Sequence, residues 1–230
     1  LDCDDLWLPH KLERQVALIA EEGDGPELGL VYGRMGILVE EEATRTPMGR
    51  SAIAANCRVS NKALPDGNIF ADLLKENVIP QPAAMVRRSA YRSVGGINRG
   101  LKHAWDYDLF VKVSKAFRAR AVQKLVCTYR IHGSNLSHTQ TMVNYSETMA
   151  IVSRYLPSRE AQLGMRSHET HFAVSEMRRG CILDGLARVM ARGDMVLFVR
   201  KFITYLRWYF ICRSRFLSKR INSDSTKARP

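Results

Sequence analysis

The chain has 230 residues, 46% of them hydrophobic and 25% charged, and its formal net charge is +12. This length and composition indicate a globular protein with one sizeable core, or a domain with an appendage. The five cysteines lie far apart and form no Cys-x-x-Cys pair, which argues against a disulfide framework and against a cysteine zinc site. A reducing compartment is therefore expected.

The positive charge is concentrated in the last part of the chain. Residues 1–140 contain 19 Lys and Arg against 16 Asp and Glu, whereas residues 141–230 contain 16 against 7. A basic tail predicts an anionic partner, which could be a phospholipid surface, a nucleic acid or an acidic protein.

The chain begins with an acidic cluster, in which Asp2, Asp4 and Asp5 lie within four positions. Carboxylates this close repel one another, and a divalent cation is their usual neutraliser at a strand end. Leu1 indicates the end of a buried strand, and a helical pattern opens at Pro9. We expect a strand, an acidic turn and a helix, in a fragment whose N-terminal part is missing. A purely structural acidic turn is the alternative.

Apolar periodicity and turn residues divide the segment up to residue 96 into short elements. The first helix should stop near the turn at 23–26, and residues 40–66 should form a long surface loop. The expected strands cover residues 28–33, 36–39 and 83–86, and the expected helices cover residues 69–77 and the segment from Ser89, as its cap, to Gly95-Gly96.

A second acidic cluster opens the next helical pattern. Leu109, Phe110 and Val113 share one helical face, so Asp106 should lie at or just before the helix N-terminus. An N-cap is the structural alternative for Asp106, and Asp108 is expected to be a capping or dipole residue. A β-like segment at 121–129 then leads to His132, in a loop of Gly, Ser and Asn.

Five short segments, taken in order, together resemble the family-2 glycosyltransferases of the GT-A fold. They are residues 1–13 with Asp-Cys-Asp-Asp, Asn77 before the strand ending in Arg87-Arg88, Val-Gly-Gly-Ile-Asn at 94–98, Trp-Asp-Tyr-Asp-Leu-Phe at 105–110, and Tyr-Arg-Ile-His at 129–132. The resemblance covers about residues 1–140. It implies an α/β fold, the later part of a Rossmann-like catalytic domain that lacks its N-terminal nucleotide-binding half.

The resemblance also implies an enzyme, an inverting glycosyltransferase of cell-surface polysaccharide or glycolipid synthesis. It would move a sugar from a nucleotide-diphosphate sugar to an acceptor hydroxyl, and the fragment alone is expected to be inactive. Mg²⁺ or Mn²⁺ would stabilise the departing diphosphate. Asp4 would be the direct ligand, Asp2 would contact the ribose or the metal, and Asp5 would support them. Asp106 matches the base that takes the proton of the acceptor hydroxyl.

Further positions in the resembling segments take roles by the same argument. His132 matches a metal or diphosphate contact, and Arg130 would add positive charge near the phosphates. The family often has an acidic residue before the base, whereas this chain has Trp105, whose ring could stack on the acceptor sugar. Arg87 would lie near the acceptor or the phosphates, or at a solvated strand end.

Residues 141–230 are expected to be a helical basic extension outside the resemblance. Helices are predicted around Met142 to Val152 and from His168 to Met190, with a break at Leu156-Pro157, and residues 222–230 should be disordered. The stretch 195–217 is apolar but interrupted by basic residues, so it should not cross a bilayer. It predicts an amphipathic helix at an anionic membrane, on its cytoplasmic face, where a lipid-linked acceptor would lie. A helix packed on the catalytic domain is the alternative.

Two other functions fit parts of the sequence. A metal-dependent phosphotransferase of the haloacid dehalogenase type also has an Asp-x-Asp turn after a strand, but it favours Thr or Val where this chain has Leu6. A basic membrane- or nucleic-acid-binding adaptor would need no catalysis. The sequence shows no zinc finger, Gly-rich phosphate loop or RNA-binding aromatic pattern, so no nucleic-acid partner is expected.

Overall fold

The structure is a computed structural model that describes residues 4–23, 27–45, 63–132, 141–178, 181–200 and 202–203. The chain forms two compact units, Leu1–His168 and Glu169–Pro230. The first unit therefore extends beyond residue 140, the boundary expected from the sequence. The reason is that Ile151, Val152 and Ala161 are buried in the same core as the residues of the sheet.

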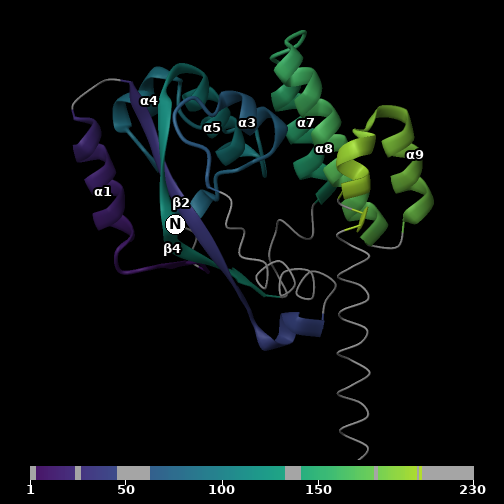
Figure 1. Cartoon of the computed structure of the whole chain (residues 1–230), viewed down its shortest axis with the longest axis horizontal. Coiled ribbons are helices and arrows are strands. Elements are labelled where there is room, and N and C mark those ends of the chain that lie inside the picture. Colours follow the sequence, from purple (N-terminus) through teal and green to yellow (C-terminus); the bar gives the residue numbers. More distant parts are fainter. Residues whose placement is uncertain are drawn as a thin grey trace, which may run out of the picture. The chain divides into compact units, whose positions relative to one another are not determined.

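A four-stranded mixed sheet, in the order β1-β4-β2-β3, lies at the centre of the first unit. The long strands β2 (Leu28–Val39) and β4 (Arg118–Ile131) run parallel, side by side (Figure 1). The short edge strands β1 (Leu6–Trp7) and β3 (Met85–Val86) pair antiparallel with β4 and β2. The chain thus has a mixed α/β fold, which confirms the α/β class predicted from the sequence.

The prediction of two strands at 28–33 and 36–39 was wrong, because β2 is continuous. Arg34 interrupts the apolar pattern, but its Nε donates to Gln123 O at 2.9 Å, and a register shift at this point lets β4 stay paired. The strand expected at 83–86 is shorter, since Gln81–Ala83 forms a 3₁₀ turn with Pro82 in its first positions.

Helices cover both faces of the sheet (Figure 1). The helix α1 (Lys11–Glu22) packs Leu18 and Ile19 against a cluster that includes Leu28, Val31 and Val126. The helices α3 (Phe70–Lys75) and α5 (Trp105–Ala116) pack against the side of β2 that carries Leu30 and Tyr32. Helices can pack on both faces because successive side chains of a strand point to opposite faces of the sheet.

Helix ends agree in part with the sequence. The first helix begins at Lys11 rather than Pro9 and ends before Gly23 as expected. The helix α4 (Arg88–Ser93) contains Ser89 inside its first turn, so Ser89 is not the cap. After it, Gly95 and Gly96 have φ of 78° and 65°, the left-handed conformation for which glycine was expected there.

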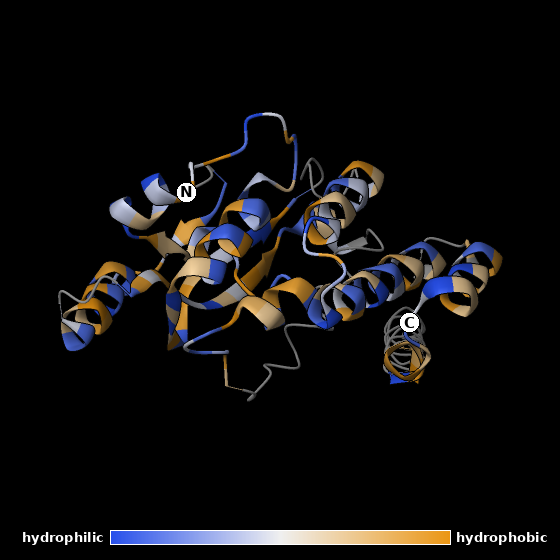
Figure 2. Cartoon of the chain, turned by 90° about the horizontal axis from the view of Figure 1, so that it is seen from above, coloured by the Kyte–Doolittle hydropathy of each residue, from blue (hydrophilic) through white to orange (hydrophobic). Residues whose placement is uncertain are grey.

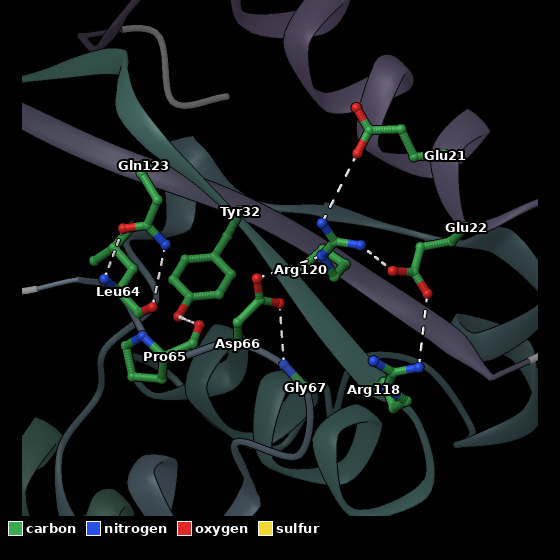
Figure 3. Close-up of polar contacts among 10 residues, drawn as sticks. All are labelled: Glu21, Glu22, Tyr32, Leu64, Pro65, Asp66, Gly67, Arg118, Arg120 and Gln123. Atoms are coloured by element: carbon green, nitrogen blue, oxygen red, sulfur yellow. Dashed lines mark hydrogen bonds and ion pairs between the residues drawn. The ribbon is translucent and has the colours of Figure 1, made fainter.

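Polar contacts attach the segment 63–67 to β2 and to the beginning of β4 (Figure 3). Tyr32 Oη donates to Pro65 O at 2.6 Å, and Gly67 pairs with Ala119 as an antiparallel bridge. Arg120 forms ion pairs with Glu22 and, at 3.3 Å, with Asp66. Within the loop expected at 40–66, Glu41–Arg45 forms a 3₁₀ helix, and residues 46–62 lie outside the described part of the chain.

The predicted extension is helical where the structure describes it. It contains α7 (Thr141–Ser153), α8 (Arg159–Arg178) and α9 (Ile182–Arg192), and residues 195–200 and 202–203 are helical too. Hydrophilic and hydrophobic residues alternate along these helices (Figure 2). In the part of the chain that the structure describes, every helix is too short or too polar to cross a membrane.

The single helix expected from His168 to Met190 is two helices. A cluster in the second unit explains the break, because Val189 of α9 packs with Ala173 and Met177 of α8. A Cβ at Gly185 would lie 2.3 Å from Met177 Cγ, so glycine permits this close approach. The helix α9 ends at Arg192, close to the predicted end at Met190.

Phe198, an aromatic residue of the stretch predicted to lie at a membrane, is buried in the second unit instead, and Phe202 is partly buried against the same cluster. Phe198 is only 7% exposed in the cluster of Ala173 and Val189, and its ring stacks on Phe202 with centroids 5.5 Å apart. This correction applies to the first part of the stretch 195–217. Its remainder, and the tail predicted at 222–230, lie outside the described residues.

Candidate active site

The acidic turn and the Tyr-Arg-Ile-His segment meet at one edge of the sheet. Antiparallel pairing sets Leu6 opposite Thr128, so the residues before β1 lie beside the residues at the end of β4. As a result, His132 Nε2 lies 2.8 Å from Asp4 Oδ2, although 128 positions separate the two residues. We call this contact the Asp4–His132 pair.

Asp5 and Arg130, next to the Asp4–His132 pair, form a second contact between the acidic turn and β4. The Asp5 side chain is buried, and its Oδ1 accepts the backbone N–H of Arg130 at 3.2 Å. Asp5 therefore connects the acidic turn to β4. Asp2 lies outside the described residues.

The charges at this edge are partly compensated within the protein. The hydrogen bond from His132 holds the pKa of Asp4 below its usual value, against the opposing effect of burial. Arg130 forms an ion pair with Glu40, and this contact raises the pKa of Arg130. The guanidinium of Arg130 is thus engaged by a carboxylate that the sequence interpretation did not include.

The pair could hold a metal ion, although it is a small ligand set. Within the described ranges, no group of three or more His, Cys, Asp and Glu side chains is arranged to hold a metal. One carboxylate oxygen and one imidazole nitrogen already face each other at 2.8 Å. Mixed oxygen and nitrogen ligands suit Mn²⁺ better than Mg²⁺, which prefers oxygen. These two ligand types are compatible with Mn²⁺ but do not distinguish it from other transition-metal ions.

The second acidic cluster lies in the first turn of α5. Trp105 is the first residue of the helix and Asp106 the second, so Asp106 is not the N-cap, a position taken by Ala104. The Asp106 side chain is half-buried, and its Oδ1 accepts the backbone N–H of Tyr107 at 2.8 Å. A carboxylate in a helical first turn is favoured by the helix dipole.

Asp108 differs sharply from Asp106, because it is 1% exposed and paired with two cations. Arg154 donates to Asp108 Oδ1, and Lys112 Nζ lies 3.0 Å from Oδ2 as an ion pair without hydrogen-bond geometry. Lys112 also donates to Gly96 O at 2.7 Å. Asp108 lies in the first turn of α5, as expected for a residue that interacts with the helix dipole, and in addition it connects α5 to the chain after α7.

The sequence interpretation missed Glu147. This residue of α7 accepts the backbone N–H groups of Lys102, His103 and Ala104 at 2.8, 2.9 and 2.9 Å. Burial alone would raise the pKa of Glu147, but the three N–H donors together outweigh it, so the pKa is lowered. The available signal was that Glu147 is the only acidic residue between positions 141 and 159.

Arg87 lies far from the Asp4–His132 pair along the sheet. Its backbone N–H donates to Gly29 O at 2.8 Å, near the beginning of β2. Arg130 pairs with Leu38, close to the other end of β2. Nine residues of strand correspond to about 30 Å, so the expected contact of Arg87 with phosphates beside Asp4 is not supported by this placement.

A comparison of the chain with models of known protein families found no match, and a comparison with curated proteins found none.

Proposed function

We propose that the chain belongs to an inverting glycosyltransferase that moves a sugar from a nucleotide-diphosphate sugar to an acceptor hydroxyl. The observation that carries the proposal is the Asp4–His132 pair, at 2.8 Å. These residues come from the first and the last of the five segments that resemble family-2 glycosyltransferases.

In the proposed reaction, Asp106 removes the proton of the acceptor hydroxyl. The acceptor oxygen forms a bond to the anomeric carbon, and the bond from that carbon to the diphosphate oxygen breaks. The diphosphate leaves with the bonding electrons, and attack from the opposite face inverts the configuration. Trp105, adjacent to the base in the same turn, would offer its ring to the acceptor sugar.

Asp4 and His132 would bind Mn²⁺, or Mg²⁺, beside the diphosphate, and Asp5 would keep the turn in place. Such an ion supplies charge stabilisation for the leaving group. Arg130 would act mainly by keeping Glu40 neutralised, because its guanidinium already pairs with that carboxylate. Asp2 would contact the ribose or the metal.

The acceptor is proposed to be a saccharide or a lipid-linked saccharide, used at the cytoplasmic face of an anionic membrane. This rests on the excess of Lys and Arg after residue 140. In the second unit, Val196 and Val199 are exposed next to Arg192 and Arg200, which are also exposed. The neighbourhood of apolar and basic side chains suits an interfacial surface.

The proposal is tested by measuring sugar transfer from nucleotide-diphosphate donors with the full-length protein. Asp4→Asn, His132→Gln and Asp106→Asn should each lower turnover, and a chelator should abolish it until Mn²⁺ is restored. Asp184→Asn is the matched control, since Asp184 is exposed in the second unit.

The product distinguishes the enzyme classes. A glycosyltransferase releases a nucleoside diphosphate and extends the acceptor, whereas a phosphotransferase of the haloacid dehalogenase type releases or transfers phosphate alone. Full turnover by both Asp4→Asn and His132→Gln would refute the assignment of the Asp4–His132 pair.

A further inference from the structure

The three residues before α5 are held by one carboxylate from another helix. Both oxygens of Glu147 face this stretch, and the backbone N–H groups of Lys102, His103 and Ala104 converge on them. Hydrogen bonds to an ionised acceptor are stronger than neutral ones, and three of them constrain the backbone at consecutive residues. Glu147 therefore sets the direction in which the chain enters α5.

This constraint continues directly into the first turn of the helix. Ala104 donates its N–H to Glu147, and its carbonyl oxygen accepts the N–H of Asp108 at 2.9 Å, the first hydrogen bond of α5. Trp105 and Asp106 lie between these two bonded positions. Their side-chain directions depend on the backbone that Glu147 and the helix fix from either side.

Other contacts hold α7 and α8 against α5 independently of Glu147. Arg154 pairs with Asp108, Tyr155 lies under Lys115 with 5.0 Å from Nζ to its ring centroid, and the Nε2 of His168 lies 3.2 Å from the hydroxyl of Tyr107. These contacts hold α7 and α8 in the position from which Glu147 binds the backbone of residues 102–104. Replacing Glu147 should consequently release residues 102–104 and leave the packing of the helices in place.

We propose that Glu147 is a positioning residue for Asp106, and that the α7–α8 segment is therefore a working part of the catalytic unit. This inference rests on the proposed function, in which Asp106 is the base. Glu147 acts through the backbone of 102–104 and has no contact of its own with the substrate. Its loss would misdirect Asp106 while leaving the Asp4–His132 pair intact.

The experiment compares Glu147→Gln and Glu147→Ala with Glu160→Gln in the full-length protein. Glu160 lies exposed in the first turn of α8, so its variant makes the same chemical change outside the loop. Hydrogen exchange over residues 102–106, thermal unfolding and steady-state kinetics are measured for each. Gln retains one acceptor oxygen and the side-chain length, which protects against simple failure to fold.

Glu147→Gln should speed exchange at 102–106 and lower kcat about ten- to a hundredfold, because small misplacements of a reacting group have effects of this order. The KM for the donor should stay unchanged. In an Asp106→Asn background, the same change should cause no further loss of kcat, since the residue through which it acts is already disabled.

Two results would overturn the proposal: an unchanged kcat in Glu147→Gln, or an equal fractional loss with and without Asp106→Asn. The failure of the proposed function is distinct. If the wild-type protein transfers no sugar, the transferase assignment fails, and the exchange data then decide on Glu147 alone. Unchanged exchange at 102–106 would overturn its positioning role, and faster exchange limited to those residues would support it.

Discussion

Asp106 and Asp108 are separated by one residue, yet the structure predicts opposite consequences of replacing them with Asn. Asp108 is 1% exposed and paired with Arg154 and Lys112, whose side chains are 44% and 24% exposed. Asp106 is half-buried at the first turn. Asp108→Asn should therefore affect stability, and Asp106→Asn should affect turnover.

The magnitude for Asp108→Asn follows from its burial. Removing one partner of a buried ion pair costs about 3–5 kcal/mol. Both cations are partly exposed and would regain water, and Asn retains an acceptor for Arg154, so we expect about 2–3 kcal/mol. For a protein of this size, that lowers the midpoint of thermal unfolding by roughly 5–10 °C. Turnover per folded molecule should change little.

Asp106→Asn should do the reverse. Loss of a general base typically lowers the rate by about 10²–10⁴. This corresponds to about 3–5 kcal/mol in activation free energy. The free energy of unfolding should change by less than about 1 kcal/mol, because Asp106 is only half-buried and Asn keeps a side-chain oxygen that can accept the backbone N–H of Tyr107.

The assay combines donor-saturated turnover with unfolding followed by circular dichroism on the same samples. If Asp108→Asn abolishes turnover while Asp106→Asn preserves it, the base has been assigned to the wrong carboxylate. If Asp108→Asn leaves the unfolding temperature unchanged, the buried network contributes no net stability.

Three further predictions test other parts of the structure. The pKa of Glu147 is lowered, so the stability that it contributes is complete above its ordinary value of 4.5 and is lost as pH falls through the folded pKa; the difference in unfolding free energy between wild type and Glu147→Gln should shrink in that acidic range, and a difference that grows there would contradict the assignment. Gly164→Ala should destabilise the first unit by about 1–2 kcal/mol in denaturant titrations, because a Cβ there would lie 2.3 Å from Leu74 O and overpacking exceeds the gain of about 1 kcal/mol in helix propensity; an unchanged midpoint would mean that α8 shifts freely. The protein should sediment with anionic vesicles, less so at high salt and scarcely with neutral ones, and Arg192→Glu with Arg200→Glu should weaken binding while the buried Phe198 stays in place; equal binding to neutral and anionic vesicles would remove the electrostatic argument.

The candidate site was only partly visible in the sequence. Asp4, Asp5 and His132 were chosen from short patterns, and their meeting required the antiparallel pairing of β1 with β4. Glu147 stood out in the sequence only as an isolated acidic residue, and its role was not predictable because an acceptor for backbone N–H groups can come from any nearby helix. Arg87 followed a recognisable segment but lies at the other end of β2.

Local physics explains what the sequence alone determined. Apolar periodicity was sufficient for α1, α5 and β4, since these elements satisfy their own backbone hydrogen bonds or expose a regular apolar face. The turn at Gly95-Gly96 was predictable because its positive φ angles favour residues without a Cβ. Such signals act within a few positions of the residues that produce them.

Contacts between distant residues decided the rest. Arg34 stays within one continuous β2 because Gln123 of the neighbouring strand accepts its hydrogen bond, and α8 separates from α9 because Val189 folds back onto Ala173. Phe198 was expected at a membrane, and the second unit buries it instead. The burial of a side chain and the partner of a charge depend on which elements pack together, and only the tertiary structure specifies that packing.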